Sequence, residues 1–197
     1  MSGKSAPPQP SDSVTAPIDV QWRQFGLISD LAERFREHQW PFENTAMQKL
    51  VFFLQTGKGV DCGYDFKLNT YGPFSASLQG DVNIAAALNA INLYFDQQSG
   101  GYRIEPGGRG ESVRKRVEQF LDQNKRAIDE VVSDFGNLFA KQLELKATVV
   151  FVALTKRHSN VPFDSGDIVD IVRGFRPQCD VAAIEVAIRE LRFKHYL

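Results

Sequence analysis

The chain has 197 residues, of which 43% are hydrophobic, and a formal net charge of -1 from 23 basic and 24 acidic residues. This length and composition suit one globular domain, or one domain with a small appended lobe. A nucleic-acid-binding domain is usually clearly basic, so the charge balance does not favour that class, although it leaves room for a local basic patch. No apolar run approaches the ~20 residues needed to cross a bilayer.

The N-terminal stretch 1–20 is rich in proline and serine and poor in apolar side chains. It cannot bury enough apolar surface to offset the entropy of ordering, which predicts a disordered tail. It also lacks the apolar segment of a secretory signal. Cys62 and Cys179 are far apart in the sequence. We therefore expect reduced thiols and a cytoplasmic protein rather than a disulfide framework.

Two helices are predicted next. Apolar side chains recur at three- and four-residue steps over 21–38, which predicts an amphipathic helix that ends before Pro41. Asn44 is suited to cap a second helix over 45–56, and Gly57 follows that helix.

An extended run and a turn separate the second helix from the third. The segment 64–71 alternates enough to form a short strand, and Gly72 with Pro73 is expected to make the turn. Ser75 is a good N-cap for a third helix over 76–89.

A β-hairpin and further helices complete the chain. Two β-prone runs flank the turn residues 98–101, which predicts the hairpin. The helix over 138–156 is apolar almost all round in its second half, so we expect it to be the most buried helix. Asp164 or Ser165 is predicted to cap the next helix, and Asp180 the last one.

These elements predict a mainly α fold with a small β-hairpin. Helices followed by a hairpin are typical of a winged helix, so the first half is expected to be winged-helix-like, with a helical C-terminal lobe. We predict boundaries at 21–110 for the first unit and 111–197 for the lobe.

The sequence shows no catalytic or metal-binding pattern. His38, His158 and His195 are not at metal-ligand spacing from one another or from a cysteine. Cys62 with a distant histidine is the alternative, but a buried, inert thiol is favoured. The glycine-rich stretches match neither phosphate-binding motif. We therefore predict a protein that is not an enzyme and that has no metal or cofactor.

A winged-helix-like half raises the alternative of a DNA-binding regulator, because the helix before the wing enters the major groove. That helix, 76–89, has no lysine or arginine and carries Asp81, so nothing on it would neutralise phosphates. The basic residues lie on the wing and beyond it, and we expect them to form a solvated face. The nucleic-acid contacts of this alternative would be Arg103, Arg109, Arg114 and Lys115.

Phe52 lies on the polar face of the second helix, between Lys49 and Gln55. Either a neighbouring element of the chain covers it, such as the turn at 71–73, or a partner protein does, since aromatic residues are enriched at interface cores. Both alternatives place the turn close to this helix.

The motif "MQKLVFFLQ" at 47–55, followed by "YGPFSASLQGD" at 71–81, resembles the Panacea domain of SocA-like antitoxins and the YwgA-like family of bacterial and archaeal proteins. The resemblance covers about 45–106. It implies a small helical domain with a short β element and no catalytic residues. In the Panacea case it also implies that the domain binds and neutralises a toxin.

This chain departs from the pattern at Phe53 and Leu54 and in its long helical C-terminal region, which places it nearer the YwgA-like proteins. The resemblance supplies no activity for those. We expect a protein-binding module, either an antitoxin or an accessory component of a phage-defence or mobile-element operon, whose partner is a toxin or a defence-system subunit. The expected partner-binding residues are the motif positions Gln48, Lys49, Tyr71, Pro73 and Ser75, with Phe52 beside them.

Overall fold

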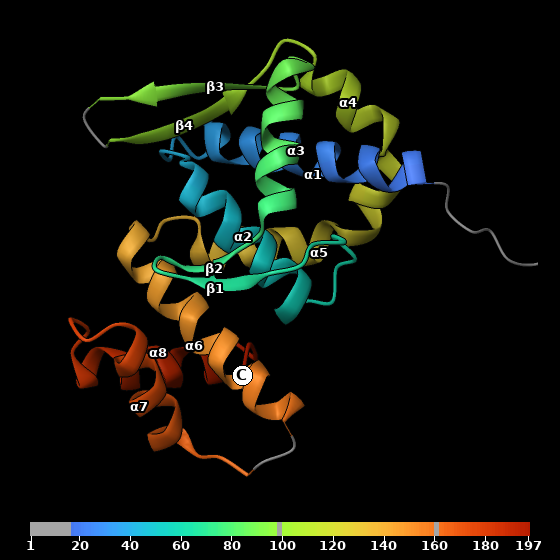
Figure 1. Cartoon of the computed structure of the whole chain (residues 1–197). Coiled ribbons are helices and arrows are strands. Elements are labelled where there is room, and N and C mark those ends of the chain that lie inside the picture. Colours follow the sequence, from blue (N-terminus) through green and yellow to red (C-terminus); the bar gives the residue numbers. More distant parts are fainter. Residues whose placement is uncertain (1–16, 98–99, 160–161) are drawn as a thin grey trace, which may run out of the picture.

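The structure, a computed structural model, describes residues 17–97, 100–159 and 162–197. Over these residues the chain is mainly helical with two antiparallel two-stranded ribbons, which confirms the predicted fold class (Figure 1). Within the described residues, no helix combines the length and apolarity needed to cross a membrane. The elements in order are α1 (Pro17–Glu37), α2 (Asn44–Gly57), β1 (Lys67–Asn69), β2 (Gly72–Phe74), α3 (Ala76–Ala87), β3 (Ile91–Asp96), β4 (Gly101–Pro106), α4 (Gly110–Arg116), α5 (Glu118–Phe135), α6 (Ala140–His158), α7 (Ser165–Phe175) and α8 (Val181–Phe193).

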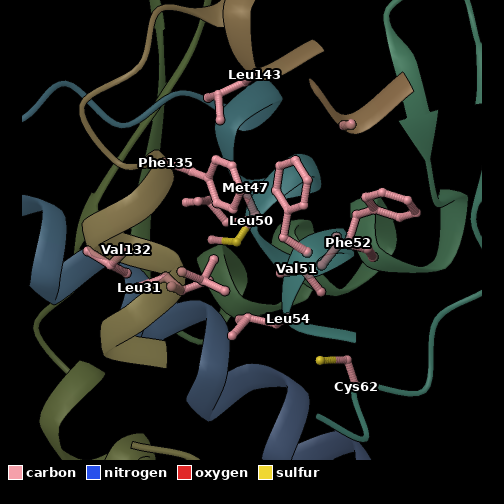
Figure 2. Packing of buried hydrophobic residues seen from close by; sticks show 14 of the residues in the cluster. Leu31, Met47, Leu50, Val51, Phe52, Leu54, Cys62, Val132, Phe135 and Leu143 are labelled. Carbon is pink, nitrogen blue, oxygen red and sulfur yellow. The ribbon is translucent and has the colours of Figure 1, made fainter. Parts of the chain in front are cut away.

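Helix α2 forms the centre of the core (Figure 2). Every residue from Met47 to Leu54 is buried, because α5, α6 and β2 contact this helix from several sides. On the α5 side, Phe53 stacks on Phe135 with ring centroids 3.9 Å apart. The prediction that the helix over 138–156 is the most buried is therefore wrong, since α6 keeps partly exposed positions such as Leu145 and Leu154.

The predicted hairpin is confirmed as β3 and β4, with Ile91 opposite Pro106 and Asp96 opposite Gly101. Of its predicted turn residues, 98–99 lie outside the described residues. The outer edge of β4 is also occupied, because the Ile104 amide donates to the Phe42 carbonyl at 2.8 Å. This bond ties the hairpin to the connection between α1 and α2.

Gly72 and Pro73 lie in strand β2 and not in a turn, which corrects the sequence-based prediction. They pair with Asn69 and Leu68 of β1, so the chain reverses at 70–71 instead. Gly72 has φ of +89°, a conformation that is open to glycine but strained for other residues. Strand β2, which begins at Gly72, packs against α2 and α6.

The helix starts show which capping predictions hold. Ser75 caps α3, accepting a hydrogen bond from the Leu78 amide at 3.4 Å. Asp164 caps α7 through a reciprocal pair of hydrogen bonds with Asp167. Asn44 is not a cap: it is the first residue of α2, and its side-chain amide donates to another side chain instead.

Two further starts differ from expectation. Asp180 is at the N-cap position of α8, but its side chain makes no capping hydrogen bond. Helix α1 begins at Pro17, inside the predicted tail, because proline is well suited to the first turn of a helix. The remainder of that tail, residues 1–16, lies outside the described residues.

Helices α7 and α8 pack on each other and on α6, beside which they lie (Figure 1), and α6 also packs on α2 and β2. Helices α4 and α5 instead pack on α1 and α2. Two ion pairs, Arg34–Asp129 and Lys58–Glu130, join α5 to the first two helices. The boundary between 21–110 and 111–197 stays a prediction.

Candidate functional site

The two sequence motifs meet in space, because side chains of α2 hold the main chain of residues 71–75, which we call the elbow. The Gln48 amide donates to the Ser75 carbonyl at 3.1 Å, and the Ser75 amide donates back to Gln48 Oε1 at 2.9 Å. Lys49 Nζ donates to the Pro73 carbonyl at 2.9 Å. A glutamine and a lysine in this order on α2 therefore fix the position and direction of the elbow.

The Lys49 ammonium lies almost fully inside the protein, with 2% of the residue exposed. Burial lowers the pKa of Lys49 to about 8. The Glu144 carboxylate opposes this change, and the Arg176 guanidinium adds to it. The site beneath the elbow is thus a buried cluster of two cations and one carboxylate.

Glu144 and Arg176 join α6 to the end of α7 in a largely buried ion pair of 2.5 Å. The Arg176 Nε atom is buried and has no hydrogen-bond partner among the described residues. The elbow passes directly over this part of α6: a Cβ on Gly72 would lie 3.1 Å from Thr148 Oγ1 and 3.2 Å from the Glu144 carbonyl oxygen. Only glycine lets the elbow approach α6 this closely.

Phe52 is 1% exposed, so the alternative in which the chain itself covers it is the correct one. The covering rings are Phe66, at 5.3 Å between centroids, and Phe151 of α6, at 6.3 Å, rather than the residues 71–73. The prediction of an exposed partner surface is corrected for five of its six residues, which are buried because they hold the elbow or fill the core. Those five are Gln48, Lys49, Phe52, Pro73 and Ser75.

Tyr71 is the predicted residue that remains on the surface, with 65% of it exposed. Phe139 and Phe175 are also exposed, at 81% and 60%. Phe139 immediately precedes α6, and Phe175 immediately precedes Arg176, which pairs with α6. Figure 1 places the β1–β2 turn, the start of α6 and the α7–α8 connection on the same side, at the left of the view. We call Tyr71, Phe139 and Phe175 the elbow surface.

Phe139, Phe175 and the Glu144–Arg176 pair were not identified from the sequence. Each aromatic lies at a helix boundary, where hydrophobic periodicity carries no information about exposure. Glu144 and Arg176 are 32 residues apart, and only the packing of α7 on α6 brings them together.

Three of the four basic residues of the nucleic-acid alternative pair with acidic side chains. Arg103 pairs with Asp96 on the neighbouring strand at 2.7 Å, and Lys115 pairs with Glu111 at 2.7 Å. Arg109 is exposed at the N-cap position of α4.

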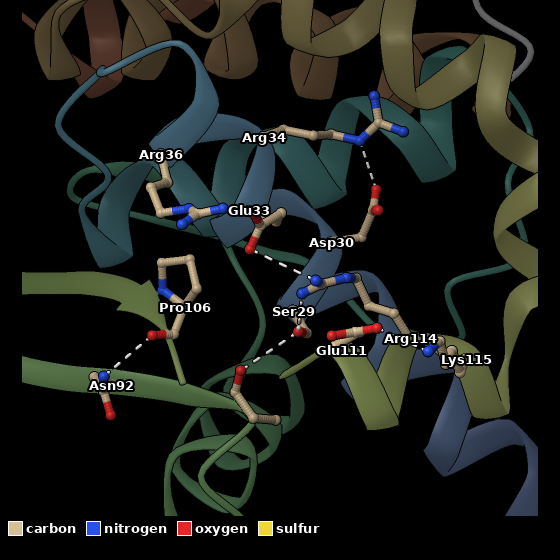
Figure 3. A network of polar contacts seen from close by, with 11 residues as sticks. Ser29, Asp30, Glu33, Arg34, Arg36, Asn92, Pro106, Glu111, Arg114 and Lys115 are labelled. Atoms are coloured by element: carbon tan, nitrogen blue, oxygen red, sulfur yellow. Dashed lines mark hydrogen bonds and ion pairs between the residues drawn. The ribbon is translucent and has the colours of Figure 1, made fainter. Parts of the chain in front are cut away.

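Arg114 corrects the expected solvated face, because it is half-buried and bridges α4 to α1 (Figure 3). It lies 3.5 Å from a Glu33 carboxylate oxygen and donates to Ser29 Oγ at 3.1 Å. The Arg114 guanidinium therefore links α4 to α1.

Cys62 and Tyr64 carry groups that could act as a nucleophile or an acid, but both side chains are buried. Burial raises the pKa of the Cys62 thiol to about 12, which keeps it protonated and inert. The Tyr64 hydroxyl donates to Asp81 Oδ2 at 3.0 Å and fastens the connection before β1 to α3. In the described part of the chain, no three side chains with metal-ligating atoms cluster together.

No protein-family model matches the chain, and no curated protein matches it significantly.

Proposed function

We propose that this chain is a non-enzymatic, cytoplasmic protein-binding module that engages its partner through the elbow surface. The observation that carries the proposal is the exposure of three aromatic residues, Tyr71, Phe139 and Phe175, on three separate elements that Figure 1 places on the same side of the molecule. Aromatic side chains are enriched at the energetic centres of protein interfaces.

The rigidity beneath the elbow surface supports the same function. Gln48 and Lys49 hold the elbow through three hydrogen bonds, and the Arg176–Glu144 pair holds the end of α7. Exposed aromatics on a pre-ordered backbone lose little conformational entropy on binding, which raises affinity.

The resemblance to Panacea and YwgA-like proteins indicates the kind of partner. A toxin neutralised by this chain, or a subunit of a phage-defence or mobile-element system, is the partner that we propose. In this assignment the task of the QKL helix is to position the elbow, and Tyr71 makes the contact with the partner.

The elbow-surface variant Tyr71→Ala/Phe139→Ala/Phe175→Ala tests the proposal. The tagged wild-type chain, purified from its native host, is expected to retain one stoichiometric partner. The triple variant should bind that partner at least ~100-fold more weakly, because truncating an aromatic hot spot costs roughly 2 kcal/mol or more. Titration calorimetry with the purified partner measures the change.

Phe193→Ala is the matched control, because Phe193 is 85% exposed on α8 and lies outside the elbow surface. It should bind like the wild type. Thermal unfolding must be similar for all three proteins, since these side chains are mostly exposed. Undiminished binding by a folded triple variant would refute the elbow surface as the interface.

DNA binding remains the alternative, but nothing in the site favours it. Helix α3 carries no lysine or arginine, and Arg103, Arg114 and Lys115 each have an acidic partner.

A further inference from the structure

The β3–β4 hairpin has one free edge. Strand β4 bonds to β3 on one side and to the Phe42–Glu43 segment on the other. No other strand pairs with β3 within the described residues. Figure 1 shows β3 along the upper margin of the molecule, with β4 between it and α1. The outer backbone groups of β3 are thus available to another strand.

The sequence of β3, INLYFD, lacks the features that usually protect an edge. It contains no proline, no lysine and no glycine bulge, and its one charged residue is at its end. That residue, Asp96, is neutralised by Arg103 at 2.7 Å. An unprotected edge of this length, ~20 Å, is a template for strand addition.

The apolar face of the hairpin continues beyond the core. Ile91 is fully buried, Leu93 is half-buried and Phe95 is 55% exposed, so exposure increases along the strand. Tyr102, opposite Phe95, is 51% exposed and meets it edge-to-face at 5.5 Å. The part of the ribbon farthest from the core therefore offers an apolar surface as well as a free edge.

We infer that the β3 edge pairs with β3 of a second copy, in a two-fold symmetric antiparallel arrangement that makes a four-stranded sheet. Such an interface is self-complementary, so the same strand must suit itself. Pairing centred at 94 places Phe95 of each copy against the half-buried Leu93 of the other. Apolar residues then face apolar residues, and no two charges of the same sign meet at the centre.

A second copy of β3 suits this edge because its own apolar residues match those of the first copy. The exposed Phe95 of one copy lies beside the half-buried Leu93 of the other, so each copy covers apolar surface of its partner. The pairing involves only six residues per copy, which is small beside a standard interface. We therefore expect a weak dimer with a dissociation constant on the order of 10 μM. This inference is independent of the proposed partner at the elbow surface.

Tyr94→Lys is the variant that tests the edge. Tyr94 is at the middle of β3, 41% exposed, and donates to Glu105 Oε1 at 2.7 Å. A lysine there can still pair with Glu105 and keep the hairpin, but it brings two positive charges together at the centre of the dimer. Sedimentation velocity over about 1–200 μM brackets a weak interface of this kind.

Wild-type protein should shift from monomer to dimer across this range, and Tyr94→Lys should weaken the dimer at least ~10-fold. Phe193→Lys is the matched control: it puts the same charge on α8, at a residue that is 85% exposed and lies outside the hairpin, and it should dimerise as the wild type does. In the wild type, hydrogen exchange of the β3 amides should become slower at the protein concentrations at which the dimer forms.

Three results would overturn the inference: a wild-type monomer at every concentration, a dimer unaffected by Tyr94→Lys, or equal disruption by both lysine variants. Protection of the β3 amides by a different protein bound to a monomeric chain would also overturn it, and would assign the edge to that protein.

Discussion

Lys49 links the two motifs, and burying its ammonium group for this purpose costs free energy of desolvation. Its ammonium is surrounded by protein and donates to the Pro73 carbonyl, so the chain must remove a charge from water to position the elbow. The lowered pKa of Lys49, about 8, reports that cost. Glu144 offsets part of it through its negative charge.

The pKa shift of Lys49 predicts an unusual dependence of stability on pH. Between pH 8 and the usual lysine pKa of 10.5, the unfolded chain binds more protons at this site than the folded chain. The free energy of unfolding should therefore rise with pH in this window. Relative to Lys49→Met, the wild type should gain roughly 1–2 kcal/mol between about pH 7.5 and 9.5. Urea denaturation at several pH values measures this difference.

Lys67→Met is the control for the pH experiment, because the Lys67 side chain is 85% exposed. Its difference from the wild type should not change over the same range. Parallel pH profiles for the wild type and Lys49→Met would show that Lys49 is solvated, contrary to the structure.

The path of strand β2 requires glycine at position 72. Gly72 combines a positive φ with contact against the α6 main chain, so it allows β2 to lie between α2 and α6. The sequence predicted a turn at Gly72 and Pro73, whereas both residues lie in strand β2. The strand pairing of Pro73 with Leu68 decides the difference.

Gly72→Ala should lower the free energy of unfolding by roughly 1–3 kcal/mol, because alanine is strained at this φ and its Cβ has no room beside Glu144. Gly80→Ala is the matched control in helix α3, where an added Cβ meets no atom within 4 Å. That change should stabilise the protein by about 0.5–1 kcal/mol. Chemical denaturation compares them, and equal effects of the two substitutions would refute the close approach.

At the scale of the whole molecule, the first two helices depend on a segment that follows the hairpin. Helix α5 covers α1 and α2 through the Phe53–Phe135 stack and the ion pairs Arg34–Asp129 and Lys58–Glu130. Without α5, a large part of the apolar surface of α2 would face water.

We therefore predict that a fragment of residues 21–110 does not unfold cooperatively when heated, whereas the full chain does, because the exposed face of α2 removes much of the core. Circular dichroism at increasing temperature makes the comparison. Mixing this fragment with 111–197 should restore a cooperative transition. A sharp transition of 21–110 alone would show that this unit folds without α5.

Most of the helices and strands, and their order along the chain, could be predicted from the sequence alone. The positions of α2, α3 and the hairpin, the Ser75 cap and the proximity of the two motifs all followed from periodicity, turn residues and capping chemistry, which are local properties. The expectation that Cys62 is a buried thiol also holds, because free cysteine is among the residue types that are most often buried.

Only the tertiary structure decided which surfaces are covered. Phe52 lies on a polar face of its own helix, yet Phe66 and Phe151 from distant parts of the chain enclose it. Arg114 lies on a charged helix, yet it bridges to Glu33. Tyr71 stays in solvent, although the other five residues expected to bind the partner are buried. Helical periodicity describes one helix against water, whereas burial is set by every element that packs on it, and those contacts join residues far apart in the sequence.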